Sequence, residues 1–284
     1  MDKISIRSQV KWSGFLFALS FLFFISCDST KNDVIFEQDE QSAYEAEEVT
    51  EHLFDVVESI TNSAIQYYGT NSGGRLAQNS DPELSCATVA FSGDVQSGRL
   101  EINFGDGCIG PDGKTRKGVI VVEYTGHWAI KDSEIFTVLQ DFYIDDIKVE
   151  GTRILTNVSL DATALVYTEE IINGKIIWPD ETYLTRMSDR THTLIFGQAN
   201  DIFELQVEGT ASGTTRLGVT YETETIEPLV FKTSCRLNSI YLPVAGIKTI
   251  TIPEKPAITV NYGNGDCDTK FTVTIDNESK EVIL

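Results

Sequence analysis

Short runs in which apolar and polar residues alternate fill the chain from Cys86 to its C-terminal end. One such run covers residues 100–104, and others begin near Leu205 and Phe271. Alternation with a period of two is typical of a β-strand with one buried face. Parallel strands need crossover helices, and the pattern contains none. We therefore expect residues 86–284 to be mainly β, as an antiparallel sandwich or an extended sheet.

The dipeptide Asn173-Gly174 lies between two apolar stretches. It is typical of a two-residue hairpin turn, because both central residues of that turn need a positive φ. We expect a turn there, within a total of roughly a dozen or more strands. A β region of this length can bury a sizeable core as one domain or as two.

Between Asp39 and residue 68 the apolar positions recur at intervals of three and four, which is the pattern of an amphipathic helix. The apolar positions include Ala46, Val49, Leu53, Val56, Val57 and Ile60, whereas Glu47, Glu48, Glu51 and Glu58 take other positions. We expect one helix over residues 39–68 with these glutamates on its polar side. Residues 69–85, which contain several glycines and polar residues, are typical of a linker.

The first 26 residues have the layout of a bacterial signal peptide, in which basic residues precede an apolar run over residues 14–25. This run is shorter than the roughly 20 residues that a membrane-spanning helix needs. A small residue, Ser26, then precedes Cys27. We expect residues 1–26 to be removed and the mostly polar residues 27–38 to form a flexible tether.

Four cysteines lie in the β region, namely Cys86, Cys108, Cys235 and Cys267. An even number in an exported chain favours disulfides, and four cysteines allow three pairings. Residues 104–108 and 262–267 are similar turns, because each places glycines and a short polar residue between an alternating strand and a cysteine. This similarity favours the pairs Cys86–Cys108 and Cys235–Cys267. It also suggests two related halves, over about residues 86–160 and 161–284.

Residues 24–27 (Phe-Ile-Ser-Cys) resemble the lipobox of bacterial lipoproteins. Together with the two cysteine turns, they make the chain similar to uncharacterised lipoproteins of the Bacteroidota type. The resemblance implies that Cys27 is lipidated and becomes the mature N-terminus, so that the membrane is a partner through a stable lipid anchor. It implies the cell envelope, and we expect the outer membrane, with the periplasmic or the surface face left open. It assigns no activity.

The mature chain is strongly acidic. Removal of residues 1–26 takes away three basic residues and one acid, so the net charge changes from −21 to −23. Such a charge repels nucleic-acid phosphates and keeps an exported protein soluble. We therefore expect no nucleic acid as a partner and expect the acidic residues to lie mainly on a solvated surface.

Three aromatic residues, Trp128, Trp178 and Tyr183, lie near turn-like polar segments. Exposed aromatic rings beside acids and amides can stack on sugars, but a tryptophan on a strand often packs in a core or at a sheet edge. Exposure of Trp178 beside a concavity would favour a glycan site.

Candidate calcium ligands lie in the two cysteine turns, namely Asp106, Asp112, Asn264, Asp266 and Asp268. Calcium needs about six to eight oxygen ligands, whereas any tight turn also needs glycine and Asx residues. We favour the turn role and expect no cofactor. The histidines His52, His127 and His192 lack the spacing of a zinc site, and His192 is expected to be an exposed strand residue.

The mature chain has no Gly-x-Ser-x-Gly motif, which disfavours a serine hydrolase. The acid pairs Asp145/Asp146 and Glu169/Glu170 could serve glycoside hydrolysis in principle, but such pairs arise by chance in an acidic chain. We therefore expect a non-enzymatic cell-envelope protein that binds an extracellular ligand such as a glycan. The alternative is a structural or adhesive surface component that contacts other envelope proteins.

Overall fold

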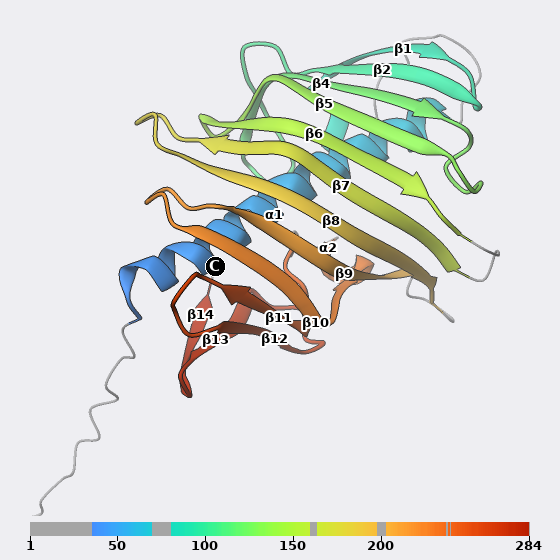
Figure 1. The fold of residues 1–284 in the computed structure, drawn as a ribbon. Helices are drawn as coiled ribbons and strands as arrows, with labels where there is room; N and C mark the ends of the chain where they lie inside the picture. The colour runs from blue at the N-terminus through green and yellow to red at the C-terminus, as the bar shows by residue number, and fades with distance from the viewer. Residues whose placement is uncertain are drawn as a thin grey trace, which may run out of the picture. The chain divides into compact units, whose positions relative to one another are not determined.

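A computed structural model of the chain describes residues 36–69, 81–159, 164–197, 203–236, 238 and 240–283. In this part of the chain, 14 strands form one antiparallel sheet in the order β1-β2-β4-β5-β6-β7-β8-β9-β10-β11-β12-β13-β14, with β3 paired to β4. Apart from β3, each strand pairs with its neighbours in sequence, as Figure 1 shows. The predicted mainly β fold with one N-terminal helix is confirmed, in its open, extended-sheet form.

The strands are β1 Thr88–Gly93, β2 Ser97–Asn103, β3 Cys108–Ile109, β4 Thr115–Thr125, β5 Glu134–Ile144, β6 Ile147–Asn157, β7 Ala164–Ile177, β8 Tyr183–Phe196, β9 Phe203–Thr214, β10 Thr220–Lys232, β11 Ala245–Thr251, β12 Ile258–Asn264, β13 Lys270–Ile275 and β14 Glu278–Ile283. The helices are α1 Gln38–Ala64, its π-helical continuation η1 Ile65–Gly69, the 3-10 turn η2 Pro82–Leu84 and the short α2 Thr233–Arg236. The helix over α1 and η1 agrees closely with the one predicted over residues 39–68.

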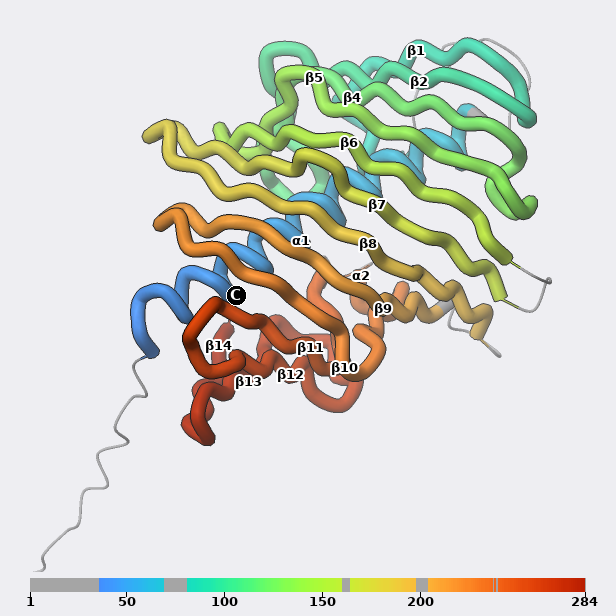
Figure 2. The backbone as a smooth tube through the Cα atoms, in the orientation of Figure 1, coloured from blue at the N-terminus to red at the C-terminus, as the bar shows by residue number. Residues whose placement is uncertain are grey.

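The long helix α1 lies along one face of the sheet, where Figures 1 and 2 show it behind the strands. Side chains from distant strands contact it, since Tyr262 on β12 donates a hydrogen bond to Glu48, and Arg153 on β6 pairs with Glu58. One continuous apolar core contains residues of both elements, among them Leu53, Ile60, Leu100, Val149 and Ile176. Helix and sheet therefore stabilise each other by burying their apolar faces together.

The glutamates of α1 correct the expectation that they lie on a solvated polar side. Glu47, Glu48, Glu51 and Glu58 are each less than a tenth exposed. Residues three or four positions apart share a helix face, and Glu47 and Glu51 are related in this way. That face meets basic side chains of the sheet instead of water, so the polar positions of the helix are buried as well as its apolar ones.

The dipeptide Asn173-Gly174 is not a hairpin turn, so that prediction is wrong. Both residues lie inside β7, where the pairing with β8 shifts just before Gly174 and the φ of Asn173 is 54°. A Cβ atom on Gly174 would lie 2.7 Å from the carbonyl oxygen of Arg186, so the close strand approach requires glycine. The dipeptide forms a β-bulge, and the turn between β7 and β8 follows at residues 178–182.

Two disulfides join Cys86 to Cys108 and Cys235 to Cys267, which are the predicted pairs. They span 22 and 32 residues along the chain. Loops of this length reduce the entropy of the unfolded chain enough to stabilise the fold by about 3 kcal/mol each in the chain-entropy model. Both cysteine turns belong to the same sheet, because the strand order is continuous from β1 to β14.

Candidate functional site

A buried cluster of charges lies between α1 and the inner face of the sheet. On β8, Arg186 and Arg190 share one face because side chains alternate along a strand. Arg186 donates a hydrogen bond to Glu47, and Arg190 donates one to Glu51. Arg190 also lies 3.2 Å from Glu47, and Arg186 lies 3.7 Å from Glu51, so the two arginines share the two acids.

Lys248 on β11 completes this cluster. Its Nζ atom lies 2.6 Å from Oε2 of Glu51 and 2.8 Å from Oε1 of Glu48. Burial opposes the ionisation of Glu51, yet the nearby arginines and Lys248 hold the pKa of its carboxyl below the usual value. For Glu48 the effect of burial prevails and raises the pKa. Burial also opposes the ionisation of Glu47, but Arg186 and Lys248 lower its pKa, so the cluster contains two carboxylates that stay ionised and one that takes up a proton more easily.

A second charged group follows toward the C-terminal end of α1. Arg153 Nη2 lies 3.1 Å from Oε2 of Glu58, and the same side chain donates to Glu169 on β7. His192 Nε2 lies 3.1 Å from Oε2 of Glu169. His192 is buried, so the expectation of an exposed strand residue is wrong. It lies on the inner face of β8, two residues from Arg190, where the acids of the helix attract cationic and hydrogen-bonding side chains.

An apolar cleft of about 280 Å³ adjoins this second group, between α1 and the inner face of the sheet. Its volume is just under the lower limit, about 300 Å³, of typical small-molecule pockets. Trp128 (39% exposed) and Phe196 (47% exposed) are partly exposed aromatic residues of its lining. The other apolar lining residues include Ile65, Leu155, Tyr167, Leu194, Leu205 and Phe231.

The polar end of the cleft contains Glu58, His192 and Arg236. The guanidinium carbon of Arg236, the last residue of α2, lies 5.2 Å from the ring centroid of Phe231. A smaller void of about 20 Å³, lined in part by Asp55, shares His192, Phe231 and Arg236 with the cleft. Charged side chains and the ring of Phe231 therefore lie together where the cleft adjoins this void.

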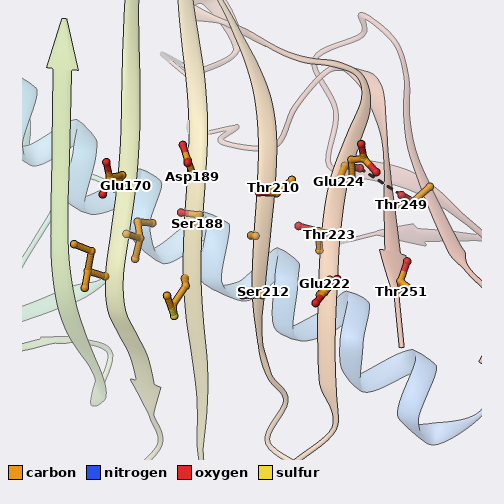
Figure 3. Close-up of a pocket in the computed structure, with 14 residues that line it drawn as sticks. Glu170, Ser188, Asp189, Thr210, Ser212, Glu222, Thr223, Glu224, Thr249 and Thr251 are labelled. Carbon is orange, nitrogen blue, oxygen red and sulfur yellow. Dashed lines mark hydrogen bonds between the residues drawn. The ribbon is translucent and has the colours of Figure 1, made fainter. Parts of the chain in front are cut away.

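The opposite, outer face of the sheet carries a shallow polar depression of about 540 Å³ (Figure 3). Five of its residues form one row across β7 to β11, because each lies opposite the next in the strand register: Glu170, Asp189, Thr210, Glu224 and Thr249. In Figure 3, α1 runs behind these strands. Directly opposed acids such as Glu170 and Asp189 repel each other, so this surface offers carboxylates and hydroxyls at some cost in stability.

The structure separates the three aromatic residues that the sequence suggested for a glycan site. Trp128, in the connection between β4 and β5, lines the cleft. Trp178 and Tyr183 lie at the other end of the strands, where the Arg216 guanidinium is 4.2 Å from the Trp178 ring centroid and Lys175 Nζ is 4.1 Å from that of Tyr183. Trp178 packs against the core and is not part of the lining of the cleft or of the outer depression.

The suggested calcium ligands have other partners in two cases. The Asp112 carboxylate lies 2.8 Å from Nη1 of Arg116, and Asp268 accepts a hydrogen bond from the backbone N–H of Lys270. The remaining candidates, Asp106, Asn264 and Asp266, belong to the same two segments beside β3 and β12. Within the described residues, no three His, Cys, Asp or Glu side chains are placed to hold a metal ion.

The two acid pairs considered for glycoside hydrolysis have different structural roles. Asp145 and Asp146 form the two-residue turn between β5 and β6, with φ angles of 48° and 65°. Glu169 faces the buried Arg153, whereas Glu170 lies on the outer face. Neither pair therefore presents two carboxylates to a common cavity.

Sequence reasoning missed both charged groups between α1 and the inner face of the sheet. The signal was the spacing of Arg186, Arg190 and His192, which places all three on one face of a strand. Glu47 and Glu51, four residues apart, likewise share one face of the helix. Arg236 carries no comparable signal, because its position depends on the short helix α2 after β10.

Comparison of the chain with protein-family models, with curated proteins and with solved structures gave no match. None of the helices in the described residues is long and apolar enough to cross a membrane. Cys27 lies outside the described residues, as do the predicted signal peptide and most of the predicted tether.

Proposed function

We propose that the chain is an exported, non-enzymatic lipoprotein of the cell envelope that binds a small apolar or amphipathic molecule in the cleft beside α1. The observation that carries this proposal is the cleft itself, with its apolar and aromatic lining and a few charged groups at one end. Concave apolar sites with a small number of polar groups are the usual form of small-molecule sites. A ligand in the cleft would cover apolar surface that water now contacts, which favours binding.

The N-terminal sequence supports the proposed location. The signal-peptide layout and the lipobox-like residues 24–27 favour anchoring through Cys27 at the outer membrane. The two disulfides favour export, because such bonds persist in oxidising compartments. A short tether would keep the cleft close to a membrane, where amphipathic molecules accumulate.

An apolar ligand is better supported than a glycan. A sugar stacks on a free ring face, and cations already lie over the rings of Trp178 and Tyr183. Trp128 lines the cleft, but the neighbours that could form a binding surface with it are mostly apolar, such as Leu155 and Leu194.

The outer face favours a second candidate function, contact with another envelope protein. Two apolar residues also line the outer depression, since Met187 is 58% exposed and Ile172 is 37% exposed. A partner that buries about 1,000 Å² in total could cover this part of the sheet. Blocking the cleft would not affect such contacts, so the two functions are separable.

Photolabelling of the full chain in its membrane tests the proposal. The probe is a diazirine-bearing 1-decanol, and unlabelled 1-decanol is the competitor. We expect saturable labelling of peptides that contain Trp128, Tyr167 or Phe196, mapped by mass spectrometry. These residues come from different connections and strands, so labelling of all three regions would locate the probe in the cleft.

Two variants of neighbouring residues on β8 give the matched comparison. Leu194 lines the cleft, whereas Ile195 is exposed and is not part of the lining. We expect Leu194→Trp to abolish the saturable labelling and Ile195→Trp to retain it. Equal labelling in both variants, or no saturable labelling in the wild-type chain, would refute binding in the cleft.

A further inference from the structure

The polar end of the cleft contains a cation whose hydrogen-bonding capacity is not used. Arg236 lines both the cleft and the adjoining small void. Its Nε and Nη2 atoms are buried and have no hydrogen-bond partner among the described residues. The nearest acid is Asp55, whose Oδ2 atom lies 3.8 Å from Nη2, beyond hydrogen-bond distance.

The other cations near this end are already paired. Arg153 pairs both with Glu58, which also lines the cleft, and with Glu169, so its charge is shared by two acids. Lys232, a further lining residue, donates its Nζ hydrogen bond to a backbone carbonyl of Gly265. Arg190 pairs with acids of α1. Among the described residues that line the cleft, Arg236 is therefore the one whose buried side-chain donors have no hydrogen-bond partner.

Asp55 neutralises Arg236 only in part. Burial raises the pKa of the Asp55 carboxyl to about 7, although Arg236 opposes this effect. At neutral pH a large fraction of Asp55 is therefore protonated, and the positive charge of Arg236 is left without a full counter-charge. This remaining positive charge, beside the unpaired donors of Arg236, favours an anion at this end.

The ring of Phe231 lies beside the guanidinium and leaves its edge as the donor surface. A guanidinium presents its N–H groups in a planar fork, which matches the two oxygens of a carboxylate. The rest of the lining is mainly apolar, although Asn62 and Gln66 also belong to it, and the volume of about 280 Å³ limits the length of a chain that the cleft can hold.

From this arrangement we propose that the ligand is a medium-chain carboxylate, whose head group binds Arg236 and whose tail lies along Leu194, Leu205 and Phe231. This inference rests on the proposed function and names the class of ligand that the same cleft takes. A neutral chain of equal length would gain the apolar contacts but not the bond to Arg236.

A comparison of two probes tests this preference in the full chain in its membrane. Diazirine-bearing decanoate and diazirine-bearing 1-decanol have similar tails and differ in charge. We expect the decanoate probe to label the cleft at a lower concentration than the 1-decanol probe. In Arg236→Gln the half-saturating decanoate concentration should rise about tenfold or more, since a charge-assisted hydrogen bond is lost. The value for 1-decanol should stay the same.

Asp55→Asn supplies a second measurement. It removes the competing negative charge while keeping the shape of the side chain, so we expect decanoate to bind more tightly and 1-decanol to be unaffected. If Arg236→Gln does not accumulate as a folded protein, this variant decides the question. If the ratio of the half-saturating concentrations of decanoate and 1-decanol is the same in Asp55→Asn as in the wild-type chain, the inference is overturned.

The outcomes separate the two proposals. If both probes label the cleft and Arg236→Gln changes neither, the carboxylate inference is wrong and the binding function stands. If neither probe labels the cleft of the wild-type chain, both proposals fail. Tighter decanoate binding that depends on Arg236 supports both.

Discussion

Replacing Lys248 by methionine should destabilise the folded chain, because it removes the cation shared by three buried acids. The Lys248 side chain is 2% exposed, and Nζ lies 2.6, 2.8 and 3.4 Å from oxygens of Glu51, Glu48 and Glu47. Methionine fills a similar volume but carries no charge. Loss of one partner of a buried ion pair costs about 3–5 kcal/mol.

Two features of the cluster place the expected loss near the lower end of that range. Glu47 and Glu51 keep their contacts with Arg186 and Arg190. Glu48 can take up a proton, because burial already raises its pKa. We therefore expect the free energy of unfolding to fall by about 3 kcal/mol. Combining Lys248→Met with Glu48→Gln should recover part of this loss.

Urea unfolding of the full chain with its disulfides oxidised, followed by tryptophan fluorescence, measures the effect. The matched control is Lys270→Met on β13. This side chain is 47% exposed and lies 3.5 Å from Glu281, so its removal should cost at most about 1 kcal/mol. If Lys248→Met costs no more than Lys270→Met, the buried charges do not depend on one another and the reasoning is refuted.

Three further predictions concern other parts of the chain. Intact mass and peptide mapping of the membrane-extracted protein without reductant should find acyl chains on Cys27 and both disulfides; an unmodified or absent Cys27 would contradict the anchor. Burial raises the pKa of Asp55 to about 7, so the folded state keeps a proton that the unfolded chain releases near pH 4, and wild-type stability falls between about pH 4 and pH 7. Asp55→Asn should remove this part of the pH dependence, which is on the order of a few kcal/mol. If the free energy of unfolding varies with pH in the same way in the wild-type chain and in Asp55→Asn, Asp55 is not its cause. Gly174→Ala should destabilise by about 1–3 kcal/mol because its Cβ would approach the Arg186 carbonyl, and an unchanged urea midpoint would show that the bulge relaxes freely.

The fold was largely predictable because its main signals are local. Alternation along a strand such as β2 follows from one buried face, and Leu100 and Ile102 are indeed fully buried. The disulfide pairs were predictable because each of the two similar turns has its own cysteine a few tens of residues upstream. The dipeptide Asn173-Gly174 was misassigned because a positive φ serves a bulge as well as a turn.

The candidate site was less predictable because it depends on matched charges from distant segments. A glutamate such as Glu47 is polar in isolation, and only Arg186, 139 residues later, makes its burial favourable. His192 was expected in solvent for the same reason, since its partner Glu169 lies on the neighbouring strand. Trp128 was identified as a candidate, but its apolar neighbours in the cleft come from separate strands and could not be grouped from sequence alone.

The order of the strands has a consequence for assembly of an exported chain. Most strands pair with the next one in sequence, so the sheet can grow by adding hairpins as the polypeptide emerges. The helix α1 emerges first, yet the cation that joins three of its acids, Lys248, belongs to β11. The helix can therefore complete its charge pairing only after most of the sheet exists. A chain that stops before β11 would leave these carboxylates without Lys248, so the first helix would be packed against the sheet with incomplete charge compensation until β11 is made.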